Sequence, residues 1–326
     1  MNRPSKQKKM EEANRPMKVL VTGGAGFIGS NLVRRLLTEG IETRVFDNFS
    51  TGRRQNIGSF GEAVEVFEGD LRDFALVLEA TKGIEIIFHE AALPSVIRSV
   101  KAPNTTNDVN VTGTLNLLEA ARVNGVRRVI YASSSSVYGD SLSLPKRERL
   151  TPNPLSPYAV SKLAGEYYMR VFNRLYGIET IILRYFNVYG PQQDPTSEYS
   201  GVIAKFINAF IDDKPIVVYG NGEQSRDFTY VEDVVEANML ASRAGISGDF
   251  FNVAGGKRYS LNQLIDTLKS LFGKSDPGVT YAAPRTGDVR HSQADVSKIK
   301  RVLGFEAKID LEQGLLGTIR WYQSNR

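Results

Sequence analysis

Short apolar runs alternate with glycine-rich turns and helical patterns from Met17 onward. This alternation predicts βαβ units, and therefore a parallel sheet that is buried on both faces. Because βαβ crossovers are right-handed, we expect an α/β fold with a doubly wound sheet, whose ligand crevice lies outside the carboxyl ends of the strands. The predicted strands are Lys18–Thr22, Thr43–Phe46, Val64–Glu68, Ile86–Phe88, Arg128–Ala132 and Thr180–Arg184.

The regular alternation of strand and helix patterns becomes less clear after about residue 190, where proline and glycine separate shorter elements. A further strand is predicted over Ile216–Tyr219, and helices near Val231–Ser242 and Leu261–Phe272. We therefore expect a disordered basic extension (1–16), a nucleotide-binding domain (17–190) and a smaller α/β lobe (191–326) that mainly binds substrate. No low-complexity linker separates the two lobes, so their boundary should be interleaved.

Composition narrows the possible chemistry. The 326 residues include no cysteine, which excludes disulfides, thiol nucleophiles and thiolate metal sites. The two histidines, His89 and His291, are too few for a histidine-rich metal site, so no metal is expected. The net charge is +5, much of it in residues 1–16, and this excess is too small to predict a nucleic-acid partner. No membrane span or secretory leader is recognised, so we expect a cytoplasmic protein.

A glycine motif opens the first helix. Gly24, Gly26 and Gly29 have the spacing G-x-G-x-x-G directly after the first predicted strand. Glycines at this point allow free backbone amides and the positive end of the helix dipole to approach a pyrophosphate. The strand–turn–helix context therefore predicts a dinucleotide site in a Rossmann domain.

The second and third strands each end in an acidic residue. Asp47 lies 18 residues beyond Gly29, where a carboxylate can accept both hydroxyls of an adenosine ribose, which favours NAD. Arg53 and Arg54 lie close by in the sequence and leave NADP open. Asp70 can accept a hydrogen bond from the adenine amino group or can cap the following helix, and both interpretations stay open.

A phenol and an amine are predicted to share one helix face. Tyr158 and Lys162 are four residues apart, after Pro157 in the first helical turn. An ammonium beside a phenol is expected to lower the pKa of the phenol, so that Tyr158 can act as a general base. The serines of YASSSSVYG follow the fifth strand and should emerge at the same sheet edge, where a hydroxyl can share a substrate proton with Tyr158.

Eight ordered motifs give the chain, from Met17 to the C-terminus, a close resemblance to extended short-chain dehydrogenases/reductases of the NAD-dependent nucleotide-sugar epimerase/dehydratase family. They are G-x-x-G-x-x-G at Gly23, Gly26 and Gly29, DN at Asp47, GDLRD, HEAA, SSSSVYG, YAVSK, LRYFNVYGP and RDFTYVEDV. The resemblance implies an enzyme with bound NAD, and within the family it is closest to UDP-N-acetylglucosamine/UDP-glucose 4-epimerases.

The positions before Val137 separate the reactions of this family. By resemblance, Ser134 is the catalytic hydroxyl, which dehydratases follow with an acid pair, whereas decarboxylases carry a Glu immediately before the valine. This chain has Ser135 and Ser136 there, and neither can readily serve as the extra acid or base that elimination needs. The resemblance therefore implies inversion at sugar C4 through a 4-keto intermediate, with transient hydride transfer to NAD.

The resemblance also assigns roles to individual residues. The catalytic residues are Ser134, Tyr158 and Lys162. The residues expected to bind the cofactor are Gly23, Gly26, Phe27, Ile28, Gly29, Asp47, Asn48, Asp70, Leu71, Ala91, Tyr158 and Lys162. Those expected to bind a UDP-sugar are Ser134, Asn187, Gln193, Gly201, Arg226, Arg285, Asp288 and Ser292. His89 is interpreted as a residue at a strand end near the cofactor rather than as a base.

Ser292 occupies a position that limits the room beside the sugar 2-substituent in similar epimerases. Its small side chain, with Gly201 and Gln193, predicts that UDP-GlcNAc and UDP-GalNAc are accepted beside UDP-Glc and UDP-Gal. The alternatives are an epimerase restricted to UDP-glucose/galactose or to UDP-glucuronate, a nucleotide-sugar dehydratase, an oxidoreductase that releases NADH, and a silent NAD-binding scaffold. In similar proteins the Tyr158 helix joins a four-helix interface, so a homodimer is expected.

Overall fold

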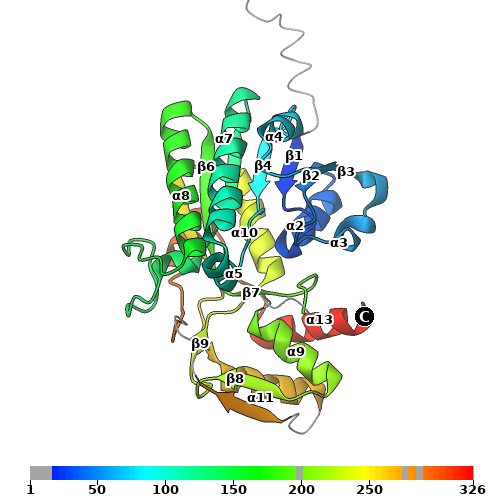
Figure 1. The fold of residues 1–326 in the computed structure, drawn as a ribbon, viewed down its shortest axis with the longest axis vertical. Helices are drawn as coiled ribbons and strands as arrows, with labels where there is room; N and C mark the ends of the chain where they lie inside the picture. Colours follow the sequence, from blue (N-terminus) through cyan, green and yellow to red (C-terminus); the bar gives the residue numbers. More distant parts are fainter. Residues whose placement is uncertain (1–16, 196–200, 274–277, 284–288, 326) are drawn as a thin grey trace, which may run out of the picture.

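A seven-stranded parallel sheet forms the larger part of the molecule (Figure 1). The computed structural model of the chain describes residues 17–195, 201–273, 278–283 and 289–325. The strands, in their order across the sheet, are β11 (Asp249–Val253), β6 (Glu179–Tyr185), β5 (Arg128–Ser134), β4 (Ile86–His89), β1 (Lys18–Thr22), β2 (Glu42–Asp47) and β3 (Val64–Glu68). The order reverses between β1 and β4, which is the topological switch point of a doubly wound fold, so the predicted α/β class is confirmed.

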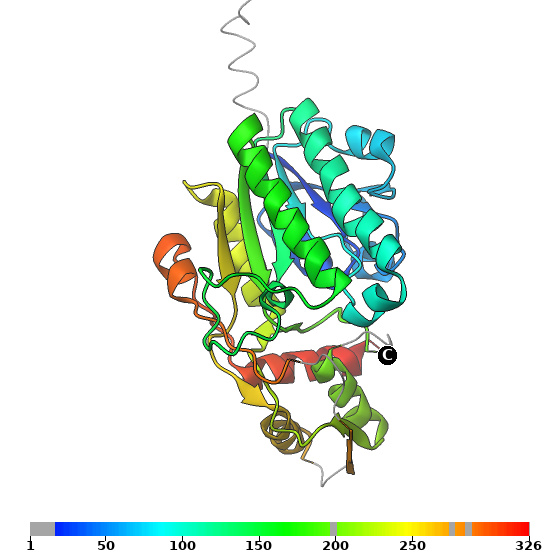
Figure 2. The same ribbon diagram turned by 60° about the vertical axis from the view of Figure 1, so that its left-hand side comes forward.

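Helices cover both faces of this sheet, as the turned view in Figure 2 shows. On one face lie α2 (Phe27–Thr38) and α10 (Val231–Arg243), and on the other α4 (Phe74–Ala80), α7 (Gly113–Val123) and α8 (Pro157–Tyr176). Successive residues of a strand point to opposite faces. In β1, Val19 and Val21 therefore pack in the first core and Leu20 packs in the second.

Shorter elements occur in the connections between the strands. They are α3 (Gln55–Gly58), a 3₁₀ turn (Gly61–Ala63), α5 (Val96–Lys101), α6 (Pro103–Asn107), a π-helical turn (Asp108–Thr112) and a second 3₁₀ turn (Ser135–Tyr138). After them, the long helix α8 begins at a defined cap, because the Ser156 hydroxyl accepts the Ala159 N–H.

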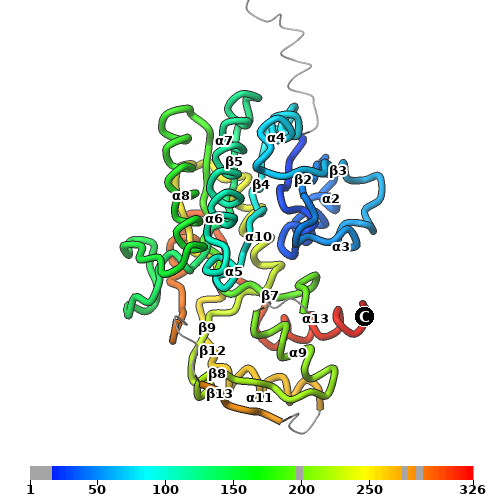
Figure 3. The backbone as a smooth tube through the Cα atoms, in the orientation of Figure 1, coloured from blue at the N-terminus to red at the C-terminus, as the bar shows by residue number. Residues whose placement is uncertain are grey.

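A smaller lobe lies below the carboxyl edge of the sheet (Figure 3). Its core is formed by one face each of α9 (Val202–Asp212), α11 (Leu261–Phe272) and α13 (Leu311–Ser324), packed with β8 (Ile216–Tyr219). A second strand, β13 (Val279–Ala282), pairs in parallel with β8. Two short ladders join the lobes: β7 (Val188–Tyr189) pairs with β10 (Thr229–Tyr230), and β9 (Ser225–Arg226) pairs with β12 (Tyr259–Ser260).

The chain returns from the smaller lobe to the large sheet. The strand β11 belongs to the large sheet, α10 packs on one face of it, and α12 (Ser297–Leu303) packs against β11. The division into two lobes at residue 190 stays a prediction. The elements α10, β11 and α12 follow residue 190 in the sequence but pack with the large sheet. The basic extension (1–16) is outside the described residues. No helix in the described part of the chain has the length and apolar content to cross a membrane.

Candidate active site

A first cavity of about 260 Å³ opens at the carboxyl ends of β1, β2 and β4, at the switch point of the sheet. It brings together all the residues that the sequence analysis assigned to the cofactor apart from Tyr158 and Lys162. These lining residues are Gly23, Gly26, Phe27, Ile28, Gly29, Asp47, Asn48, Asp70, Leu71 and Ala91. Residues from four separate segments of the sequence therefore meet where a dinucleotide is expected.

The glycine turn forms a backbone cradle in the wall of this cavity. Gly23 has a φ of +69°, a conformation that side chains other than glycine rarely adopt, and it contacts Ala91 across the switch point. A Cβ added to Gly29 would lie 2.1 Å from the carbonyl oxygen of Gly23. The helix α2 begins after Gly26 without a side-chain cap for its first amides. These amides and the helix dipole suit the pyrophosphate of NAD, so the residues present fit this cofactor.

Asp47 is held at the end of β2 by the backbone. Its Oδ2 accepts the Ala25 N–H at 2.9 Å and its Oδ1 accepts the Phe49 N–H at 2.8 Å. Burial raises the pKa of this carboxyl, and the two N–H groups oppose the shift. Each carboxylate oxygen accepts more than one hydrogen bond, so Asp47 can also bind ribose hydroxyls.

Asp70 pairs with its neighbours rather than with the following helix. The Arg72 guanidinium lies 2.8 Å from its Oδ2, and the Asn48 amide donates to the same oxygen at 2.8 Å. These contacts hold the pKa of Asp70 well below its usual range. The alternative that Asp70 caps the next helix is wrong, because the side chain of Asp73 caps α4.

A phenol, a hydroxyl and an amine converge at the end of β5. Tyr158 lies in the first turn of α8 and Ser134 is the last residue of β5, and the two side chains are close enough for Ser134 to lower the pKa of the phenol. Lys162 lies one turn further along α8, and its ammonium donates to the carbonyl oxygen of Ala132 at 2.7 Å. The structure therefore brings together the three residues predicted to be catalytic.

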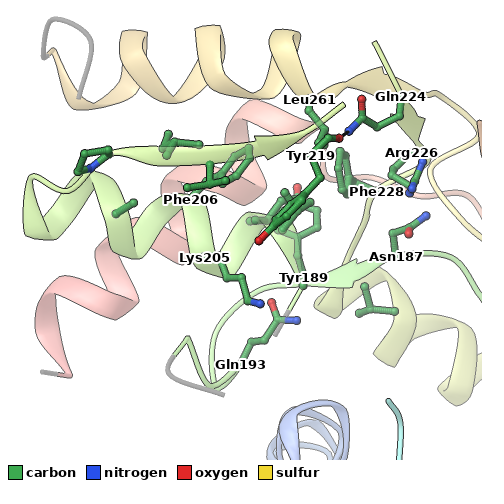
Figure 4. Close-up of a pocket in the computed structure, with 18 residues that line it drawn as sticks. Asn187, Tyr189, Gln193, Lys205, Phe206, Tyr219, Gln224, Arg226, Phe228 and Leu261 are labelled. Atoms are coloured by element: carbon green, nitrogen blue, oxygen red, sulfur yellow. Dashed lines mark hydrogen bonds between the residues drawn. The ribbon is translucent and has the colours of Figure 1, made fainter. Parts of the chain in front are cut away.

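A second cavity, of about 480 Å³, lies in the smaller lobe (Figure 4). Four predicted substrate residues line it: Asn187, Gln193, Gly201 and Arg226. Asn187 adopts a left-handed backbone conformation, with a φ of +35°, and its amide donates to the carbonyl oxygen of Asp227 at 3.0 Å. Asp227 in turn accepts the backbone N–H groups of Gly256 and Ala294, which fixes the surrounding loops.

Comparison with known proteins identifies the family. Residues 19–254 match the model of the "NAD dependent epimerase/dehydratase family". A putative UDP-glucose 4-epimerase from Methanocaldococcus jannaschii is 40% identical over 94% of this chain and 99% of its own length. The chain belongs to the NAD-dependent epimerase/dehydratase family.

Solved structures of family members share the whole fold. A UDP-glucose 4-epimerase from Thermotoga maritima, solved with UDP-glucose, has 38% identity and a TM-score of 0.91 over 94% of this chain and 99% of its own. A UDP-N-acetylglucosamine 4-epimerase from Methanobrevibacter ruminantium M1, solved with UDP-N-acetylmuramic acid, has 38% identity and a TM-score of 0.91 over 96% and 100%. The expected family, the expected class of enzyme and NAD as its cofactor are therefore confirmed.

Burial is the largest influence on the pKa values of Tyr158 and Lys162 in the reaction centre. It raises the pKa of Tyr158 to about 12, against the lowering effect of the hydrogen bond with Ser134, and lowers that of Lys162 to about 8. The expected net lowering of the phenol pKa is not found, because burial outweighs the effects that favour the phenolate. Tyr158 is therefore a neutral phenol at neutral pH.

His89 is occupied on both sides of its ring. Nδ1 is hydrogen-bonded to the Thr22 hydroxyl at 2.8 Å and Nε2 to the Thr114 hydroxyl at 2.9 Å. Burial lowers its pKa to about 3, so the ring is neutral. Thr22 also accepts the Ala91 N–H at 3.3 Å, which ties the histidine to the cofactor cavity. A supporting position, rather than a catalytic one, follows from these contacts.

The sequence analysis missed several residues of the second cavity, among them Lys205, Tyr219 and Gln224. A signal was present in β8, where Ile216 and Val218 are buried but Val217 and Tyr219 are 47% and 38% exposed. Large apolar side chains on the outward positions of a strand indicate a surface that a ligand or partner covers.

Four substrate predictions are not among the lining residues of this cavity. Ser134 lies at the end of β5, in the reaction centre. Ser292 is buried, and its N–H donates to the carbonyl oxygen of Ser225, the neighbour of the lining residue Arg226, at 3.0 Å. Arg285 and Asp288 lie outside the described residues.

Proposed function

We propose that the protein is a UDP-sugar 4-epimerase that inverts C4 through a 4-keto intermediate. The observation that carries this proposal is the meeting of Tyr158, Ser134 and Lys162 at the end of β5, the neighbour in the sheet of β4, after which Glu90 and Ala91 line the dinucleotide cavity. A proton-transferring group there can serve a sugar whose nucleotide occupies the smaller lobe. Bound NAD supplies reversible hydride acceptance from the sugar carbon.

The chain's own residues move the proton. Tyr158 reacts from the phenolate form, the minor form at neutral pH: the phenolate takes the proton of the sugar 4-hydroxyl as the ketone forms, and the phenol returns this proton when the alcohol is rebuilt. Ser134 lowers the pKa of the Tyr158 phenol, and its hydroxyl can form a hydrogen bond with the substrate hydroxyl. Lys162 places a positive charge beside the phenol as it loses its proton. Because the reaction ends at the oxidation level at which it began, NAD stays bound through turnover.

The alternatives of dehydration and decarboxylation have less support in these residues. Both reactions need a carboxyl group near the catalytic serine, by resemblance to the rest of the family. Here Ser135 and Ser136 begin the 3₁₀ turn after β5, and a hydroxyl is too weak an acid for that role. Intact Tyr158 and Lys162 likewise argue against a silent scaffold.

The substrate class follows from the second cavity. Arg226 and Lys205 supply cationic groups in its wall that suit a diphosphate, and the exposed ring of Tyr219 offers a face on which a base can stack. Gly201 leaves room in the wall of this cavity, and by resemblance to similar epimerases the small Ser292 does the same beside the sugar 2-substituent. We infer that UDP-GlcNAc and UDP-GalNAc are substrates, with UDP-Glc and UDP-Gal as a second pair.

A homodimer belongs to the same proposal. Val160, Tyr167, Val171 and Leu175 are each 45% to 66% exposed and lie along one face of α8. An exposed apolar face of this kind suits pairing with α8 of a second copy, as in similar proteins. Sedimentation of the wild type and of Tyr167→Glu should show a dimer and a monomer. A cytoplasmic location and the absence of nucleic-acid partners also stay predictions.

The deciding experiment incubates the purified protein with single UDP-sugars, without added NAD, and separates the 4-epimers. Conversion of UDP-GlcNAc to UDP-GalNAc, and of UDP-Glc to UDP-Gal, is expected, with no stoichiometric release of NADH. UDP-glucuronate is included because Lys205 and Arg226 could also accept an acidic sugar. Conversion of UDP-glucuronate alone, or a 4-keto-6-deoxy product, would overturn the proposal.

A further inference from the structure

A buried carboxyl group in the cofactor cavity has no role in the reaction described above. Glu90 follows β4 and lines the cavity beside Ala91. Its Oε1 accepts the hydroxyl of Tyr185, from β6, at 2.8 Å. That hydroxyl oxygen itself accepts the amide of Asn238, from α10, at 2.8 Å. Since the amide nitrogen of Asn238 can only donate, the Tyr185 proton is directed to Glu90, and this bond orients the carboxylate.

Strand register places this carboxylate near Lys162. His89 of β4 is paired with Tyr131 of β5, so Glu90 and Ala132 follow at the same level on adjacent strands. The Lys162 ammonium donates to the Ala132 carbonyl oxygen and lies 5.0 Å from the centre of the Tyr131 ring. The two opposite charges therefore stand at neighbouring strand ends.

We propose that Glu90 is a positioning residue of the reaction centre, whose carboxylate, oriented by Tyr185, keeps the buried Lys162 side chain in its charged form. This inference rests on the proposed function only for its catalytic consequence. An ammonium buried without a counter-charge loses its proton readily, and Tyr158 would then lose the positive charge that supports its phenolate.

The other groups around Lys162 supply less of this counter-charge. Glu166, one turn further along α8, also raises the pKa of Lys162, but less than Glu90 does. Two hydrogen bonds from the buried Arg184, at 2.8 and 2.6 Å, already compensate its charge in part. His89 is neutral between two threonines. Tyr131 and Tyr158 are neutral phenols with raised pKa values. Among the described groups facing Lys162, Glu90 is thus the carboxylate without an arginine partner.

The negative charge of Glu90 and the positive charge of Lys162 stabilise each other. Burial raises the pKa of Glu90 to about 7 and lowers that of Lys162 to about 8, and the attraction between the two charges opposes both shifts. Removing the carboxylate must lower the pKa of Lys162 further, because the attraction is lost while burial remains. The alkaline limit of activity, where Lys162 deprotonates, should then move to lower pH.

The test titrates Lys162 directly, in the full-length protein with its NAD, by NMR of lysine labelled with ¹³C at Cε. The Lys162 signal is identified by its loss in Lys162→Met. In Glu90→Gln we expect its titration midpoint to fall by about one pH unit or more, a tenfold change in proton affinity. Glu90→Asp should restore part of the shift. Glu79→Gln, which removes an exposed carboxylate that pairs with Lys82, is the matched control and should leave the midpoint unchanged.

Tyr185→Phe provides a second variant that keeps the carboxylate. The hydrogen bond from Tyr185 lowers the pKa of Glu90, so its loss should protonate Glu90 at higher pH and lower the Lys162 midpoint by a smaller amount. In the epimerase assay, the alkaline limb of kcat for Glu90→Gln should shift downward with the NMR midpoint.

Identical Lys162 titration curves in the wild type and in Glu90→Gln would overturn the inference. A Glu90→Gln variant that loses thermal stability but keeps the pH dependence of the wild-type activity would also overturn it. The NMR measurement needs no sugar turnover. A failed epimerase assay with a shifted Lys162 midpoint would therefore contradict the proposed function and leave the role of Glu90 intact.

Discussion

The two cavities differ in the part of the chain that lines them: mostly backbone in the first cavity and mostly side chains in the second. The cofactor cavity is lined by a glycine turn, strand ends and the first amides of a helix, and its contacts are largely with backbone atoms. The second cavity is lined by side chains from β7, α9, β8, β9 and α11, which are distant in the sequence. A local backbone conformation leaves a complete sequence motif, whereas of the wall assembled from five elements the motifs contain only a few residues, such as Asn187 and Arg226.

The sharpest way to separate the reaction centre from both cavities is Tyr158→Phe. The substitution removes the phenolic oxygen and retains the ring, so NAD content and UDP binding should remain near wild type. We expect kcat to fall by roughly 10³-fold or more, because general acid–base catalysis of this kind contributes about 10²–10⁴-fold. The measurement is epimerisation of UDP-GlcNAc, with the absorbance of bound NAD as control. Activity within tenfold of wild type would remove Tyr158 as the base.

A pair of glycine substitutions compares the cavities directly. A Cβ at Gly29 would meet the Gly23 carbonyl oxygen at 2.1 Å, whereas at Gly201 the nearest atom is the amide nitrogen of Gln193 at 3.5 Å, an ordinary contact. Gly29→Ala should therefore lose NAD and about 1–3 kcal/mol of stability. Gly201→Ala should retain both. Chemical denaturation and the NAD content of the purified variants check this, and equal losses in the two variants would contradict the contrast.

The same contrast explains how far the sequence could be interpreted. The predicted bounds of β1, β3, β8 and α11 agree with the structure, because each begins and ends at a local signal. Gly23, Gly29 and Asp47 were placed in one cavity for the same reason: their roles follow from the turn and the strand end that carry them.

What the sequence could not supply depends on pairing between distant segments. The strand β11 was missed because nothing in DFFNV indicates that it pairs with β6, some 70 residues earlier. Lys205 and Gln224 belong to no recognised motif, and packing of the lobe alone brings them to the second cavity. The raised pKa of Tyr158 was missed because the burial of a phenol beside a lysine is a tertiary property.

Ser134→Ala tests the electrostatic side of the reaction centre. The hydrogen bond with Ser134 lowers the pKa of Tyr158, so its removal should raise that pKa above about 12 and reduce the phenolate fraction at neutral pH. We expect activity at pH 7 to fall about 10²-fold, within the usual range for such a group. The loss should become smaller as pH rises. A pH–rate profile parallel to that of the wild type would show that Ser134 acts in some other way.

The smallest effect is expected at Ser292, where the second cavity's specificity is proposed to reside. Ser292 is buried and bonded to Ser225, the neighbour of the lining residue Arg226, so a larger side chain there must displace groups next to the cavity wall. Ser292→Tyr should reduce kcat/KM for UDP-GlcNAc about tenfold or more and leave that for UDP-Glc within about threefold, since a lost pocket contact is worth about 1–3 kcal/mol. Ser292→Ala, which adds no bulk, is the control. An equal loss for both sugars would show that the substitution damages the lobe, and the cavity would then select its substrate through side chains other than Ser292.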